Sequence, residues 1–103
     1  MIIYNVTVNI DLDVHDDWLK WMKESHIPDV MATGMFIDNK VSKVITGEEE
    51  GGLTYSIMYT CKDMATLEIY QEKHAPALQA GHTKRYAGKF GAFRTLLEVV
   101  HTV

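Results

Sequence analysis

The chain has 103 residues, of which 47% are hydrophobic and 23% charged, and its formal net charge at pH 7 is -4. This length and composition predict one globular domain over residues 1–103 with a single core. The excess of 14 acidic over 10 basic residues argues against a broad surface for nucleic acid or for an anionic membrane.

The beginning of the chain and its one cysteine bear on location. Residues 1–5 contain no basic side chain, and no apolar run approaches the roughly 18 residues of a membrane span. We therefore expect neither a signal peptide nor a transmembrane helix. Cys61 is the single cysteine, which excludes an internal disulfide and fits a reducing compartment. The sequence thus predicts a cytoplasmic protein in which Cys61 packs at a strand end.

The first half of the chain reads as a strand, a bent helix and a second strand. Residues 2–10 alternate apolar and polar side chains, a period of two that predicts a strand with one apolar face. From residue 18 to His26 the apolar positions recur every three or four residues, which predicts a helix. A short continuation through Pro28 ends near Gly34. Residues 35–46 predict a second strand whose charged side chains suit a sheet edge.

The second half repeats this order. Residues 47–52 predict a solvated turn, and residues 53–60 alternate as a third strand. Asp63 is the expected N-cap of a second helix, which runs through a break at Pro76 and stops by Gly81 or Gly88. Residues 93–100 predict a fourth strand.

A segment around each proline occurs twice at a constant spacing. The matching pairs are Glu24 with Glu72, His26 with His74, Pro28 with Pro76, Val30 with Leu78 and Ala32 with Ala80. Proline lacks an amide hydrogen and is tolerated only in the first turn of a helix, so each proline ends one helical segment and begins another.

Two interpretations of His26 and His74 follow from this repeat. Each imidazole could simply hydrogen-bond backbone groups freed by the helix break. Alternatively, the two could be brought together as ligands or as acid and base groups.

A twofold β-α-β repeat predicts the ferredoxin-like α+β fold, with order βαββαβ. We expect a four-stranded antiparallel sheet with the first and third strands central and both helices on one face. The helix-covered face should carry Tyr4, Val6, Val8, Tyr55, Ile57, Tyr59, Phe93 and Leu97. The opposite face should carry Ile3, Asn5, Thr7, Asn9, Thr54, Ser56, Met58, Thr60, Arg94, Leu96, Glu98 and Val100.

The mixed character of this opposite face predicts a partner. It is too apolar in part for open solvent and too polar for an ordinary core, so we expect two copies to pack these faces together. The resulting homodimer would close an eight-stranded α+β barrel.

Several motifs together resemble a known family. They are Trp18-Leu19-Lys20-Trp21-Met22, His26-Ile27-Pro28-Asp29-Val30, Thr33-Gly34, the start at Tyr4 to Thr7, and Phe93-Arg94-Thr95. The whole chain is similar to an uncharacterised family of roughly hundred-residue bacterial proteins known only as a domain of unknown function. More distantly, a Trp-rich first helix ending in His-x-Pro is similar to the dimeric α+β barrel superfamily. That group contains cofactor-independent monooxygenases, haem-degrading enzymes, isomerases and non-catalytic members.

The superfamily resemblance implies a dimer and a pocket between sheet and helices. In that space this chain would place His26, His74, Tyr4, Tyr55, Tyr59, Trp18, Trp21 and Tyr70. Aromatic side chains with a few polar tips suit a flat apolar ligand, although such side chains also fill ordinary cores. Haem degradation in the superfamily uses an Asn, a Trp and a His. Because Tyr70 stands where the Trp is expected, the resemblance does not extend to haem chemistry.

A second candidate cluster lies on the face turned towards the partner. It comprises Asn5, Thr7, Ser56, Arg94 and Glu98. Here Arg94 would form a structural ion pair or hold a carboxylate or phosphate ligand through its fork of donors.

Metal and nucleic-acid sites are weakly supported. Residues 48–50 are consecutive glutamates but lack the spacing of a calcium loop, so we expect no metal. Residues 89–93 faintly resemble the glycine-aromatic stretch of RNA-recognition modules, yet they precede the fourth strand, and the third strand lacks stacking rings on its open face.

Two hypotheses for function remain, with RNA binding a remote third. The first is a non-enzymatic homodimer that binds a small apolar ligand without a cofactor. The candidate ligand-binding residues are His26, His74, Tyr4, Tyr55, Arg94 and Asn5. The second is a cofactor-independent enzyme of monooxygenase or isomerase type, with His26 or His74 as the base.

Overall fold

Four antiparallel strands form one sheet in the order β2-β3-β1-β4 in the computed structural model, which describes residues 1–46 and 51–103. The strands are β1 (Ile2–Ile10), β2 (Asp38–Lys43), β3 (Leu53–Cys61) and β4 (Phe90–Glu98). β1 and β3 are central, and every neighbouring pair is antiparallel. The predicted ferredoxin-like fold is therefore confirmed. β2 is an edge strand, as its charged side chains indicated, but is shorter than expected.

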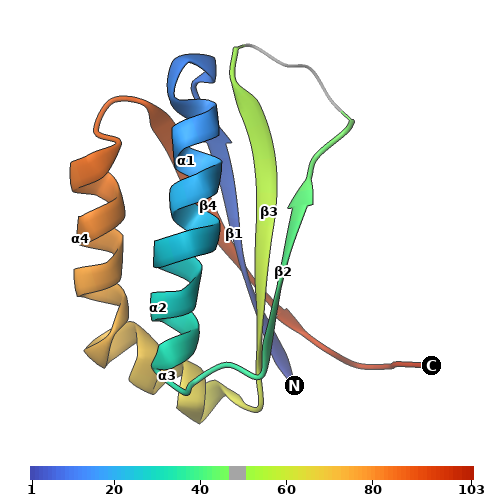
Figure 1. Cartoon of the computed structure of the whole chain (residues 1–103). Coiled ribbons are helices and arrows are strands. Elements are labelled where there is room, and N and C mark those ends of the chain that lie inside the picture. The colour runs from blue at the N-terminus through green and yellow to red at the C-terminus, as the bar shows by residue number, and fades with distance from the viewer. Residues whose placement is uncertain (47–50) are drawn as a thin grey trace.

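The helices lie together on one face of this sheet (Figure 1). After β1 come the short 3-10 turn η1 (Leu12–Val14), α1 (His15–Trp21), the π-helical segment η2 (Met22–His26) and α2 (Ile27–Ala32). After β3 come α3 (Met64–Lys73) and α4 (Ala75–Arg85). No helix of the described residues is both long and apolar enough to span a bilayer.

The two prolines act differently on their helices. At Pro28 the chain stays helical, but it widens into η2, where the Ile27 amide donates to the Met22 carbonyl. This wider turn relieves the clash that a proline ring makes with a preceding carbonyl. At Pro76 the helix breaks: His74 leaves helical geometry (φ -118, ψ -41) and α4 begins anew. The Asp63 carboxylate caps α3 by accepting from the Thr66 amide at 2.8 Å, as predicted.

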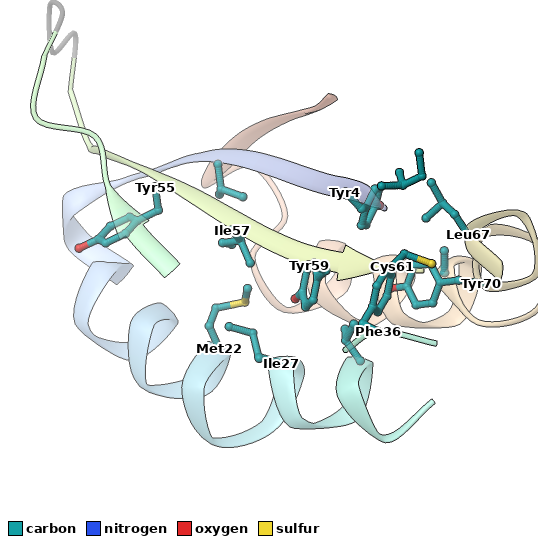
Figure 2. Close-up of a cluster of buried hydrophobic side chains, with 14 of the residues drawn as sticks. Tyr4, Met22, Ile27, Phe36, Tyr55, Ile57, Tyr59, Cys61, Leu67 and Tyr70 are labelled. Atoms are coloured by element: carbon teal, nitrogen blue, oxygen red, sulfur yellow. The ribbon is translucent and has the colours of Figure 1, made fainter. Parts of the chain in front are cut away.

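The hydrophobic core fills the space between helices and sheet (Figure 2). Its buried members are Ile2, Tyr4, Val8, Ile10, Trp18, Met22, Ile27, Val30, Phe36, Tyr55, Ile57, Tyr59, Cys61, Leu67, Tyr70, Ala75 and Tyr86. Near one end Phe36 packs against Tyr59 and Tyr70, with ring centroids 5.0 and 4.7 Å apart. Cys61 is fully buried at the end of β3, as expected for a packing residue.

The predicted orientation of β4 is wrong. Val6 pairs with Arg94 and Tyr4 with Leu96, so Arg94 lies on the helix-covered face, while Phe93 and Leu97 lie on the open face. The alternation in β4 is ambiguous because both faces of this strand carry apolar residues. The strand begins earlier than expected, at Phe90, whose ring packs edge-on against His82 at 4.4 Å. That contact fixes which face of β4 turns inward.

The central part of the open face agrees with the prediction. Asn5 donates to the Thr7 hydroxyl at 3.0 Å and accepts from the Ser56 hydroxyl at 2.5 Å, which links β1 to β3. Phe93 is 62% exposed and Leu97 is 41% exposed on the same face. Residues 47–50 of the turn predicted over residues 47–52 lie outside the described residues.

Candidate functional site

A small cavity of about 50 Å³ lies between the helices and the sheet and opens partly to solvent. Its lining comes from β1, β3, β4, η2, α2, α3 and α4. The lining residues are Tyr4, Val6, Val8, Met22, His26, Val30, Ile57, Tyr59, Tyr70, Leu78, Gln79, His82, Thr83, Phe90, Ala92 and Arg94. The lining is mainly apolar and aromatic, with a few polar tips, which is the usual make-up of a small-molecule site.

The local sequence explains how the polar ends of the lining side chains come to lie at the cavity. The π-helical segment contributes both Met22 and His26, and π-helical turns are frequent at functional sites. His82 lies one turn after Leu78 on α4, so both side chains share the inward face of that helix.

His82 is held by a buried hydrogen bond. The Trp18 indole N–H donates to His82 Nε2 at 2.9 Å. Because Nε2 accepts, the proton of the neutral imidazole resides on Nδ1. Burial, with the nearby His26 and Arg94 adding to it, lowers the pKa of His82 to about 4. His82 is therefore neutral at pH 7, with a fixed tautomer.

The second ring nitrogen of His82, Nδ1, has no hydrogen-bond partner among residues 1–46 and 51–103. Within the same residues, no fully buried side-chain nitrogen or oxygen lacks a partner. Nδ1 therefore has accessible surface, and His82 is one of the residues that line the cavity. The arrangement offers one N–H donor to a guest molecule.

His26 is a second neutral imidazole. Its ring centroid lies 5.1 Å from that of Trp21 and 5.8 Å from that of His82. Burial lowers the pKa of His26, and the charge of Asp29 opposes this only in part. In the described part of the chain, no side chain hydrogen-bonds the His26 ring, so a ring nitrogen is available to accept a proton.

Arg94 supplies the positive charge of the lining. Its Nε donates to the Tyr4 hydroxyl at 3.1 Å, which leaves the terminal guanidinium nitrogens for other partners. No aspartate or glutamate belongs to the described lining, and no carboxylate of the described chain forms an ion pair with Arg94. Burial also raises the pKa of Tyr59 and of Tyr70 well above the usual range, so both phenols stay protonated.

The structure brings three of the six predicted ligand-binding residues together: Tyr4, His26 and Arg94. The other three lie elsewhere. His74 stacks on Tyr70 at the break before α4 but does not line the cavity. A hydrogen bond of 2.7 Å joins the Tyr55 hydroxyl to His15 Nε2, away from the cavity. Asn5 belongs to the open face of the sheet.

His82 lines the cavity but is not among the six residues that the sequence predicts to bind a ligand. The helical spacing of Leu67, Tyr70, His74 and Leu78 continues by four to His82 and by a further four to Tyr86. Extending this pattern past Gly81 would have found His82. The described residues contain no group of three or more His, Cys, Asp or Glu side chains able to hold a metal ion.

Comparison with solved structures supports the fold. The heme-degrader MhuD from Mycobacterium tuberculosis, whose structure has two hemes bound in its active site, is 16% identical, with a TM-score of 0.73 over 100% of this chain and 99% of that chain. SnoaB, a cofactor-independent oxygenase from Streptomyces nogalater, is 8% identical. Its TM-score is 0.68, and the match covers 99% of this chain and 96% of SnoaB. A dimeric ferredoxin-like protein from an uncultured marine organism is 14% identical. Its TM-score is 0.71, and the match covers 99% of this chain and 96% of that protein. At these identities the likeness establishes the fold alone.

Sequence comparison gives one further result. Residues 1–100 match the family described as a domain of unknown function (DUF4286). No curated protein matches the chain in sequence.

Proposed function

Because the chain belongs to the DUF4286 family, whose function is unknown, we propose from the cavity itself that the protein binds a small, mainly apolar molecule between its sheet and its helices. The single observation that carries this proposal is a concave, mainly apolar lining into which a few polar tips converge. The size of the cavity limits the ligand. A cavity of about 150 Å³ takes up benzene, and this one is about a third of that volume. The enclosed space is therefore smaller than a benzene ring requires, and a guest of that size or larger would extend through the open side of the cavity.

The test is to fill the cavity. Ala92 lines it from β4, so Ala92→Leu should occupy part of the space and abolish binding of small aromatic probes such as indole. Ala77→Leu is the matched control, since Ala77 is exposed on α4 and does not line the cavity. Binding is measured by calorimetry or by a change in melting temperature. Equal binding by both variants would contradict the proposal.

The second part of the proposal is that the protein works as a homodimer that joins the open faces of two sheets. Phe93 and Leu97 are large apolar side chains exposed on this face, beside the Asn5–Ser56 hydrogen bond. A solved neighbour is named as a dimeric ferredoxin-like protein. The closed eight-stranded barrel would bury these apolar side chains.

Sedimentation velocity tests the dimer. Phe93→Lys should shift the protein to the monomer. Ile69→Lys should not, because Ile69 is 43% exposed on α3, on the helix side of the sheet. A monomeric wild type at micromolar concentration would refute this part of the proposal.

The acidic balance of the chain and the buried thiol of Cys61 further support a cytoplasmic protein that acts on small molecules rather than on nucleic acid.

A second candidate function is base catalysis by His26. The specific observation is a neutral imidazole beside the cavity, with no hydrogen-bond partner for its ring among the described residues. Such a group can remove a proton from an acidic C–H or O–H of a bound molecule. A solved neighbour is named as a cofactor-independent oxygenase, which is compatible with proton abstraction as a first step.

Hydrogen exchange tests this candidate. The protein should accelerate the exchange of the methyl hydrogens of acetophenone for deuterium in D₂O, measured by NMR, beyond the rate with free imidazole. His26→Gln should return the rate to background, while His101→Gln, in the exposed tail, should leave it unchanged. Binding retained without any acceleration would leave the protein as a binding domain.

A further inference from the structure

The lining of the cavity has an unbalanced charge. Arg94 supplies a permanent positive charge, and no acidic side chain belongs to the described lining. Each of the three ion pairs of the described residues joins groups outside the cavity. The site is therefore suited to a guest that brings its own negative charge.

Arg94 is also oriented. Its Nε–H is engaged by the Tyr4 hydroxyl at 3.1 Å, and the Tyr4 ring is itself buried between Phe36 and Tyr70, at centroid distances of 6.0 and 5.8 Å. Fixing one edge of the planar guanidinium leaves its remaining N–H groups to bind a carboxylate. Arg94 is exposed, and without this anchor its side chain would lose more freedom on binding.

His82 adds a neutral donor near this charge. Its tautomer is fixed by the Trp18 indole, so the proton resides on Nδ1. Arg94 and His82 both belong to the lining of this one small cavity. Two donors around mainly apolar walls match an amphipathic acid rather than a strongly hydrated multivalent ion.

We propose that the ligand of this cavity is a small monocarboxylate, whose anionic group is bound by the Arg94 guanidinium and by His82 Nδ1–H while its apolar part enters the space beneath the helices. This inference rests on the proposed function, because it assumes that the cavity takes up a small molecule. It adds the chemical class of that molecule and the residues that select it.

The chain carries its own reporters for a binding test. It contains two tryptophans, and both contact the site: Trp18 donates to His82, and the Trp21 ring lies against His26 and His82. Intrinsic fluorescence and the indole N–H signals of an NMR spectrum therefore report occupation of the cavity. The probes are isosteric acid and amide pairs, butyrate with butyramide and benzoate with benzamide, with inorganic phosphate as a different anion.

We expect an acid to bind at least about tenfold more tightly than its amide, the typical effect of a charge-assisted hydrogen bond. Arg94→Met should remove this preference without changing the affinity for the amide. Lys84→Met is the matched control, because it removes the same charge from an exposed position that does not line the cavity. Arg94→Lys should retain part of the preference, and Tyr4→Phe should weaken it by releasing Nε.

The outcomes separate this inference from the proposed function. If acids and amides bind equally well, the carboxylate inference is overturned while the cavity remains a binding site. If no probe of either kind binds, the proposed function fails. Binding of phosphate in competition with the acids would also overturn the inference, since it would show a general anion site. Melting temperatures of the variants show whether each one is folded.

Discussion

The burial of His82 predicts a stability that depends on pH. The folded protein holds the pKa of His82 at about 4, against an ordinary value of 6.5. Between these two values the unfolded chain binds a proton at this position and the folded chain does not. Stability therefore rises with pH through this window, is fully present above about pH 6.5, and is lost as the pH falls towards about 4.

The size of this loss in stability follows from how far the pKa of His82 is lowered on folding. One pKa unit corresponds to about 1.4 kcal/mol, so the whole displacement sets an upper limit of about 3 kcal/mol. Because the cavity is partly open, solvent screens some of this penalty, and we expect a loss of about 1–3 kcal/mol from pH 7 to pH 4. The main cause of the loss is the burial of the charged imidazole, and protonation also removes the acceptor of the Trp18 indole.

Urea unfolding at fixed protein concentration measures this effect. The wild type is compared with His82→Gln, whose amide oxygen can accept from the indole but does not titrate. The difference in free energy of unfolding between the two proteins should shrink as the pH falls from about 7 to about 4. His101→Gln, in the exposed tail, should follow the wild type. A constant difference between wild type and His82→Gln would refute the assignment of a buried, neutral His82.

Substitutions at three further positions probe separate parts of the structure. Trp18→Phe should raise the pKa of His82, followed by NMR titration, because the neutral form loses the indole donor that stabilises it. Asp63→Ala should lower the urea midpoint by removing the cap of α3, and Asp63→Asn should lower it less, because an amide oxygen also caps. Gly52→Ala should destabilise the protein by about 1–3 kcal/mol in the same assay, because Gly52 has φ +79 and a Cβ there would clash with the Ile10 carbonyl oxygen. A Gly52→Ala protein as stable as the wild type would contradict the close approach of these two strands.

Most of the fold was predictable because local signals and global packing agree. The alternation of β1 identified its buried face correctly, with Tyr4 and Val8 inside and Asn5 outside. Asp63 was recognised as a cap from its position before an apolar helix. These signals depend on neighbours within a few residues, which is the range that a sequence displays directly.

The errors arose where a distant contact decides. Both alternations of β4 are chemically acceptable, and the packing of Phe90 on His82 selects the one that brings Arg94 beneath the helices. Similarly, the repeat favoured His74 as the partner of His26. The break before Pro76 starts α4 along a new axis, so that the inward position falls to His82 instead. Neither choice can be made from spacing alone, because each depends on how two elements meet in space.

The hydrogen bond between Trp18 and His82 connects stability with the chemistry of the cavity. It joins the helix after β1 to the helix before β4, and it fixes the imidazole proton on Nδ1, where a guest can use it. A bound carboxylate would place a negative charge beside His82 and raise its pKa, which makes protonation easier. By linkage, protonation would in turn strengthen the binding of the acid while it weakens the contact between the two helices. Ligand affinity and protein stability should therefore change in opposite directions as the pH falls from about 6.5 while the acid itself stays ionised, that is above roughly pH 5.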